Sequence, residues 1–184
     1  MAVVEIKTPL SKITRKKLKA GDHVRISGII YTARDAAHKR MIEALEQGQD
    51  LPVDLTDQII YYVGPCPAKP GEIIGSAGPT TSGRMDAMSP RLLDLGNKIM
   101  IGKGKRDAAV KEAVVRNGAV YLAALGGAGA LMAKSVQTLE VIAWPDLGCE
   151  AVRRLTVQDM PLTVILDAHG GDLYLEGPEA YRNR

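Results

Sequence analysis

The sequence predicts an α/β protein with a mixed central sheet, and three observations support this. Short apolar runs rich in β-branched residues alternate with helix-like segments between residues 22 and 144. Residues 136–166 are dominated by strand-like runs, and the tight Gly170-Gly171 turn that follows them is typical of an antiparallel portion. Nothing in between resembles a linker, so we expect one domain over residues 1–184.

Local patterns predict the elements of the first half. The run DHVRISGIIY at 22–31 predicts a strand, and residues 34–45 predict a helix that ends before Gly48. The basic run at 15–19 predicts the solvated face of a short helix. The other expected strands are residues 3–6, 59–63 and 72–76.

Capping signals place the helices of the second half. Ser89-Pro90 predicts a helix start, with Ser as N-cap and Pro at the first helical position. Residues 108–116 predict a helix that stops at Asn117-Gly118. We expect a small-residue turn and short helix at 126–130, and a turn at 169–172 before Leu173-Tyr-Leu175. The remaining expected strands are residues 98–101, 119–124, 136–144, 152–157 and 162–166.

The composition excludes several classes of protein. A chain of 184 residues that is 46% hydrophobic can bury a substantial core, here built without Phe and with one Trp. A net charge of +3, with few aromatics beside the basic residues, argues against nucleic-acid binding. The sequence has no apolar run long enough to span a membrane and no secretory signal pattern, so we expect a cytoplasmic protein with no membrane partner.

Residues 61–86, YYVGPCPAKPGEIIGSAGPTTSGRMD, are the most informative segment. A turn this rich in Gly and Pro exposes backbone N–H groups in fixed directions. The hydroxyls of Thr80 and Thr81 and the guanidinium of Arg84 add further donors. Because arginine meets a carboxylate as a rigid two-pronged donor, the segment predicts a site for a small anion, most naturally a carboxylate.

The same segment approaches the spacing of a phosphate-binding P-loop but departs from it where the chemistry matters. Arg84 replaces the lysine, and Met85 replaces the hydroxyl residue that would hold Mg²⁺. Pro79 removes a backbone donor as well. The sequence therefore argues against a nucleoside triphosphatase, whose chemistry depends on that ion.

Three cations each follow a predicted strand or turn. Arg34 opens a helix after the strand at 22–31, Arg84 closes the Gly/Pro turn, and Lys103 follows the strand at 98–101. Each alone is as readily an ordinary surface charge. Because ligands in open α/β sheets bind beyond the carboxyl ends of the strands, together they predict a pocket for a dicarboxylate.

The cysteine count limits metal chemistry. Cys66 and Cys149 are 83 positions apart and cannot supply a four-cysteine zinc site or an iron–sulfur cluster. We expect each to be a small buried hydrophobic residue and no metal to be bound by this chain. Any cluster would have to come from another chain.

Several sequence blocks resemble the class I (iron–sulfur) fumarase family, at the β subunit or the equivalent C-terminal domain of single-chain enzymes. These blocks are YTARDAAH at 31–38, Gly64-Pro65, GSAGPTTSGRMD at 75–86 and IGKG at 101–104. The resemblance continues through GGA at 126–128, WPDLGCEA at 144–151 and DAHG at 167–170, so it covers nearly the whole chain. It implies a swivelling β/β/α domain and a hydro-lyase of the tricarboxylic acid cycle that hydrates fumarate reversibly to L-malate.

The resemblance also implies a cofactor and a partner. In this family a [4Fe–4S] cluster is held by three cysteines of the α part, so the cluster is expected in an α subunit and not in this chain. Close packing of the small residues at 126–130 against a partner chain is as plausible as a plain turn, and a homodimer contact is left open.

By position, the resemblance assigns carboxylate binding to Arg34, Arg84 and Lys103, with Thr80 and Thr81 at the substrate. Thr80 and Arg84 match residues of the catalytic machinery. The family threonine has been proposed as a base, but a free threonine is a very poor base, so we expect Thr80 to donate a hydrogen bond.

Three more residues of these blocks are expected to support the site. Asp35 lies next to Arg34, and His38 lies four residues after Arg34 on the same helical face, where it is expected to orient that residue. Asp86 is expected to cap or pair locally after Arg84.

Two other functions stay open at this point. The β subunit of L(+)-tartrate dehydratase shares the GPTTS core, although the Gly83-Arg-Met-Asp86 ending favours a fumarase. A non-catalytic dicarboxylate-binding module would use the same basic, Gly-rich pocket and would bind its ligand without a partner.

Overall fold

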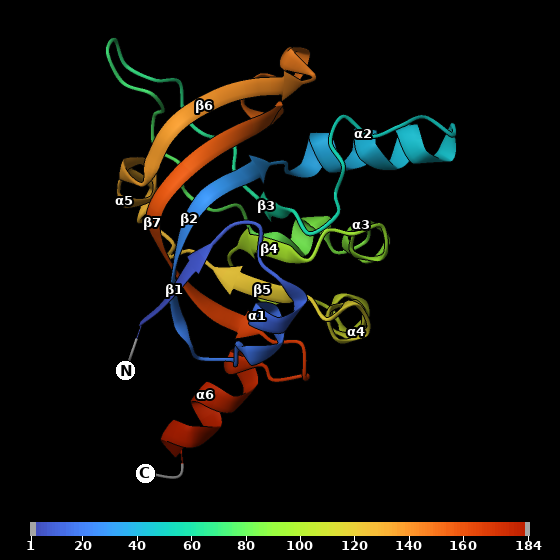
Figure 1. Cartoon of the computed structure of the whole chain (residues 1–184), viewed down its shortest axis with the longest axis vertical. Helices are drawn as coiled ribbons and strands as arrows, with labels where there is room; N and C mark the ends of the chain where they lie inside the picture. The colour runs from blue at the N-terminus through green and yellow to red at the C-terminus, as the bar shows by residue number, and fades with distance from the viewer. Residues whose placement is uncertain (1–2, 183–184) are drawn as a thin grey trace.

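The structure is a computed structural model that describes residues 3–182 and, within them, a seven-stranded mixed sheet (Figure 1). The strand order is β1-β2-β3-β4-β5-β7-β6, and β2 also pairs with β7. Five strands, β2 to β5 and β7, therefore close into a barrel-like ring, with β1 and β6 attached outside it. The strands are β1 (Val3–Lys7), β2 (His23–Thr32), β3 (Ile59–Tyr61), β4 (Ile99–Gly102), β5 (Val120–Ala123), β6 (Val136–Ala143) and β7 (Val152–Leu166).

Strand direction gives the ring two different ends. Strands β1 to β5 are parallel to their neighbours, whereas β7 runs antiparallel to β2, β5 and β6. The carboxyl ends of β2 to β5 therefore meet at one end of the ring, where β7 begins. The mixed α/β class predicted from the sequence is confirmed.

The helices lie outside the ring, and α2, α3 and α4 cover one side of it (Figure 1). Alternate residues of each strand face opposite ways. In β3, Ile59 and Tyr61 join a core that draws on all the ring strands, while Ile60 joins a second core with residues of α2, α3 and α4. The helices are α1 (Lys12–Lys17), α2 (Asp35–Glu46), α3 (Ser89–Asp94), α4 (Ala108–Asn117), α5 (Gly129–Lys134) and α6 (Leu173–Arg182), with short 3-10 helices η1 (Ser82–Met85) and η2 (Pro145–Glu150).

Some boundaries differ from those expected. Residues 72–76 form a loop and no strand, because Gly75 and Ser76 bond locally back to Cys66. The two strands expected at 152–157 and 162–166 are one continuous strand, β7, which pairs with β2 along most of its length. Ser89 is the first residue of α3, and Met88 stands at the N-cap position.

The turn at 169–172 leads into helix α6 and not into the antiparallel part of the sheet. The Asp172 carboxylate accepts a hydrogen bond from the backbone N–H of Tyr174 at 2.9 Å, which satisfies one of the free donors at the helix start. The antiparallel pairing near the end of the chain comes instead from β6 and β7.

The lysines of the basic run at 15–19 are exposed, as expected of a solvated face, whereas Arg15 is buried. The Arg15 guanidinium donates to the Leu10 carbonyl and to Asp57, both at 2.7 Å, and to the Gly118 carbonyl at 3.3 Å. Arg15 therefore ties α1 to the loop before β3 and to the end of α4.

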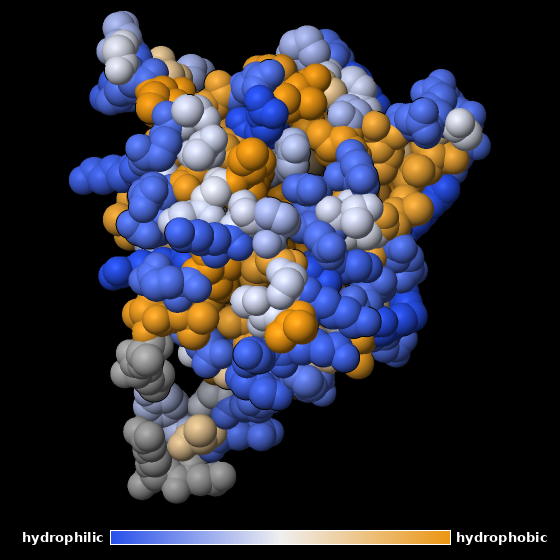
Figure 2. Space-filling view, in the orientation of Figure 1, coloured by the Kyte–Doolittle hydropathy of each residue, from blue (hydrophilic) through white to orange (hydrophobic). Residues whose placement is uncertain are grey.

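The surface carries charged and polar residues with apolar patches between them, as Figure 2 shows for one face. Within residues 3–182, none of the helices is both long enough and apolar enough to span a bilayer.

Candidate functional site

The predicted site residues gather where the parallel strands end. Lys103 directly follows β4, and its backbone N–H donates to the Thr80 carbonyl at 3.3 Å. The Thr80 N–H in turn donates to the Tyr62 carbonyl just after β3 at 2.7 Å. These bonds hold the Gly/Pro turn against the ends of β3 and β4.

One carboxylate joins the two arginines of the site. The Nε atom of Arg34 donates a hydrogen bond to Asp35 at 2.9 Å, and the Nε atom of Arg84 forms an ion pair with the other oxygen of Asp35 at 2.6 Å. Burial on its own raises the pKa of Asp35, but the hydrogen bond from Arg34, the Asp35 N–H and the two positive charges outweigh it and leave this pKa below its usual 3.8. Asp35 is therefore ionised at neutral pH.

A second carboxylate, which the sequence reasoning missed, supports Arg34. Glu150 at the end of η2 lies 3.4 Å from the Nη2 atom of Arg34, and its other oxygen accepts from the Ala36 N–H at 2.7 Å. It thus satisfies a free donor in the first turn of α2. Gly64 permits the close packing, because a Cβ there would lie 3.1 Å from the Arg34 guanidinium. Glu150 belongs to the WPDLGCEA block at 144–151, but nothing in the sequence indicates that it pairs with Arg34.

His38 holds the backbone of Arg34 and does not contact its guanidinium. The Nδ1 atom lies 3.1 Å from the Arg34 carbonyl oxygen, and the ring packs edge-on against Tyr62 at 5.1 Å between centroids. Burial lowers the pKa of His38 to about 4, so the ring is neutral at pH 7, and Nδ1 donates to that carbonyl. His38 therefore contacts Arg34 through the backbone of the first turn of α2, and its orienting role stays a prediction.

Asp86 pairs with Arg106, which lies 20 residues further along the chain, and not with a residue of its own turn. It accepts from the Nε atom of Arg106 at 2.6 Å and from the Asp107 N–H at 2.7 Å. The fully buried Arg106 side chain also donates to Ser89 Oγ at 2.7 Å. Its guanidinium carbon lies 5.4 Å and 5.1 Å from the ring centres of Tyr62 and Tyr121, within the range of cation–π contacts.

Arg106 was missed because no local pattern distinguishes a buried arginine from a surface one. Tyr121, which packs on Arg106, connects it to the turns that carry Arg84 and Lys103. The Tyr121 hydroxyl lies 2.9 Å from Ser82 Oγ and donates to the Gly104 carbonyl at 2.9 Å. Ser82 packs closely against the backbone of Gly102, and glycine is needed there because a Cβ would overlap the Ser82 hydroxyl.

The site opens to solvent on one side. The Arg84 side chain is 53% exposed and Thr81 is exposed, whereas Thr80 is buried. Within the part of the chain that the structure describes, no acidic side chain pairs with the Lys103 ammonium. The arrangement therefore presents Arg84 Nη groups and the Lys103 ammonium, which are suited to bind carboxylates and to stabilise negative charge.

The residues of this chain do not fit an iron–sulfur cluster. Such clusters are held mainly by cysteine thiolates, and the chain has two cysteines. Among residues 3–182, no group of three or more His, Cys, Asp or Glu side chains is arranged to hold a metal ion. Cys66 and Cys149 are both exposed, so the expectation of buried thiols is wrong: Cys66 lies in a loop, and Cys149 lies at an exposed position of η2.

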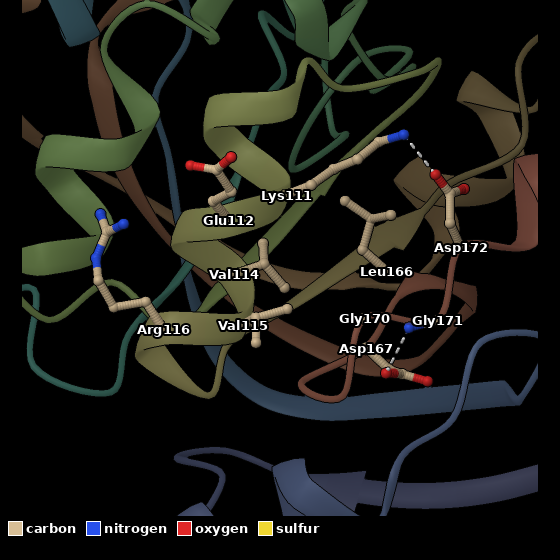
Figure 3. Close-up of a pocket in the computed structure, with 10 residues that line it drawn as sticks. All are labelled: Lys111, Glu112, Val114, Val115, Arg116, Leu166, Asp167, Gly170, Gly171 and Asp172. Atoms are coloured by element: carbon tan, nitrogen blue, oxygen red, sulfur yellow. Dashed lines mark hydrogen bonds and ion pairs between the residues drawn. The ribbon is translucent and has the colours of Figure 1, made fainter.

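A separate cleft of about 460 Å³ lies at the opposite end of the ring (Figure 3). The side chains of Val114, Val115 and Leu166 line it, and a 2.7 Å ion pair joins Lys111 to Asp172 at one side. None of the predicted site residues lines this cleft.

Asp167, which borders this cleft, predicts a pH dependence of stability. Burial alone raises its pKa, but backbone N–H groups of Ala20, His169 and Gly171 and the charge of Lys19 outweigh it and hold this pKa below its usual 3.8. As the pH falls below 3.8, the unfolded state binds a proton before the folded state does, so the free energy of unfolding decreases.

We expect Asp167→Asn to make the free energy of unfolding less dependent on pH in this acidic range. Urea unfolding of both proteins between pH 3 and pH 6 measures the effect. Equal pH slopes for the two proteins would contradict it.

Sequence comparison places these features in a known family. The model of the family described as "Fumarase C-terminus" matches residues 1–177. "Fumarate hydratase class I, aerobic" from Salmonella typhimurium is 35% identical over 93% of this chain and 30% of its own length. "Fumarate hydratase 2" from Leishmania major is 36% identical over 93% of this chain and 31% of its own length.

A third relative is similar in length to this chain. A protein of Methanocaldococcus jannaschii named "Putative L(+)-tartrate dehydratase subunit beta" is 42% identical over 91% of this chain and 89% of its own length. By contrast, the chain spans less than a third of the two fumarate hydratases. The family match over residues 1–177 and these identities show that the chain belongs to the Fumarase C-terminus family.

Proposed function

We propose that this chain is the β subunit of a hydro-lyase that hydrates fumarate reversibly to L-malate, and that it is active only with an α subunit. The observation that carries the proposal is the pair of arginines joined by Asp35 beside the Lys103 turn. The names of the fumarate hydratases and of the subunit-sized relative support it.

The geometry suggests how this chain contributes to hydration. When hydroxide adds to one alkene carbon of fumarate, the electron pair of the double bond moves to the other carbon and is delocalised into the carboxylate attached there, until a proton adds to that carbon. In the reverse reaction that proton is lost first and the hydroxide leaves. Arg34, Arg84 and Lys103 bind the carboxylates and stabilise the negative charge that grows on them. Thr80 and Thr81 donate hydrogen bonds at the same turn, and the open face leaves room for a partner to complete the site.

We assign the [4Fe–4S] cluster of the proposed enzyme to the α subunit, because the residues of this chain do not fit one. The proposal also includes a cytoplasmic location. It is supported by Cys66 and Cys149, which are exposed free thiols of the kind that persist in reducing compartments.

The β subunit of an L(+)-tartrate dehydratase is the second candidate. The observation that favours it is the 42% identity with the Methanocaldococcus jannaschii protein over nearly the full length of both chains. Fumarate, malate and tartrate all carry two carboxylates, so the same cations would bind any of them.

The test is to mix this chain anaerobically with its candidate α subunit and to follow fumarate by its ultraviolet absorbance. We expect turnover in the mixture and none with either chain alone. Parallel assays with L-malate and L(+)-tartrate separate the two candidates, since turnover of tartrate alone would favour the second.

A mixture inactive on all three substrates, with tight dicarboxylate binding by this chain alone, would contradict both candidates. That result would favour a non-catalytic binding module instead.

A further inference from the structure

We propose that Asp35 is a positioning residue that holds Arg34 and Arg84 at their Nε atoms, which leaves the Nη groups of Arg84 to bind a substrate carboxylate. The inference rests on the proposed function and adds a residue that acts through the two arginines. In this arrangement the Asp35 carboxylate, at the start of α2, is a fixed part of the binding site.

The contacts on each side of Asp35 support this assignment. The Nε atoms of both arginines lie against different oxygens of the same carboxylate, as a hydrogen bond from Arg34 at 2.9 Å and an ion pair with Arg84 at 2.6 Å. The side chains come from separate elements, the start of α2 and η1. Arg84, which Asp35 contacts at Nε, still has both Nη groups as donors for a two-pronged carboxylate contact, whereas Nη2 of Arg34 lies 3.4 Å from Glu150.

Arg84 depends on Asp35 more than Arg34 does. Glu150 and the packing on Gly64 also hold Arg34. Within residues 3–182, Asp35 is the one side chain that pairs with Arg84, whose own side chain is 53% exposed. Without Asp35, this long side chain would sample many rotamers and would have to be ordered by the substrate itself, which weakens binding.

The charge of Asp35 and its positioning role predict opposite results. Removing a negative charge beside two cations raises the positive potential at the site, so an effect of charge alone lowers the KM for a dicarboxylate. Loss of positioning raises the KM. The sign of the KM change therefore separates the two roles, and a mere loss of stability changes the amount of active enzyme and not its KM.

The first experiment compares Asp35→Asn with wild type in the complex with the α subunit. We expect the KM for fumarate to rise about tenfold with kcat within about threefold. In an Arg84→Ala background the same substitution is expected to raise KM less than about threefold, because its main partner is absent. Asp146→Asn is the matched control. Asp146 accepts hydrogen bonds through both oxygens from Arg40, an exposed arginine of α2, and this substitution is expected to leave KM unchanged.

The second experiment needs no activity. Phenylglyoxal, which modifies free guanidinium groups, is applied to this chain, and the labelling rate of each arginine is followed by peptide mass spectrometry. We expect Asp35→Asn to label Arg84 about threefold faster, with Arg40 unchanged.

The two measurements distinguish failure of the inference from failure of the proposed function. An active wild-type complex with an unchanged or lower KM for Asp35→Asn overturns the positioning role while the proposed function stands. If the wild-type complex turns over none of the substrates, the labelling still decides whether Asp35 holds Arg84, and equal rates overturn the inference.

Discussion

Replacing Arg84 with alanine is expected to lower kcat/KM for hydration by about 10²- to 10³-fold, the usual cost of removing one donor aimed at developing negative charge. Arg84 offers its Nη groups at the open face of the site, and its side chain is 53% exposed, so its loss removes little packing. The chain should therefore stay folded. Initial rates over a range of fumarate concentrations, with the purified complex, measure the change.

Arg91→Ala is the control for this experiment. Arg91 is an exposed arginine on α3 that pairs with Glu46 at 3.5 Å, away from the strand ends. We expect it to keep wild-type kinetics. If Arg84→Ala also kept wild-type kcat/KM, Arg84 would have no part in the reaction.

Arg106→Met is expected to destabilise the fold by about 3–5 kcal/mol, because it leaves a buried carboxylate without its partner charge. Asp86 is almost completely buried and would keep only the Asp107 N–H as a donor, while Ser89 would lose its bond from the guanidinium. Urea unfolding followed by circular dichroism measures the loss.

The double variant Arg106→Met with Asp86→Leu tests the cause. Removing both charges abolishes the penalty of the lone carboxylate, so we expect the double variant to recover much of the lost stability. If the double variant is no more stable than Arg106→Met, the loss comes from packing against Tyr62 and Tyr121 and not from an unpaired charge.

Local signals in the sequence predicted most of the elements. The helix expected at 108–116 is α4, which Asp107 caps at its start and Gly118 ends with a φ of 57°, in the left-handed region that glycine tolerates. Apolar runs likewise predicted the short parallel strands, because those strands are buried on both faces. The strand expected at 72–76 does not form because this segment bonds locally back to Cys66, and β7 is not split because its distant pairing with β2 overrides the local pattern.

Candidate site residues could be proposed from the sequence, but their contacts could not. Gly/Pro turn chemistry and the cations after the strands pointed to Arg34, Arg84 and Lys103. The bridge through Asp35, the support from Glu150 and the burial of Arg106 each depend on side chains brought together from separate elements. Residue type and spacing carry no information on such pairings, because a charged side chain has the same local pattern whether it is buried or exposed.

The closure of the ring by β7 has a consequence for synthesis on the ribosome. Strand β7 is the last of the sheet in chain order, and it supplies the antiparallel partner of both β2 and β5. A nascent chain that ends before Val152 therefore has two unpaired edges and an open apolar interior. The parallel strands are made first but stay unprotected until the final strand emerges, which makes this interval the one in which the chain most needs a chaperone.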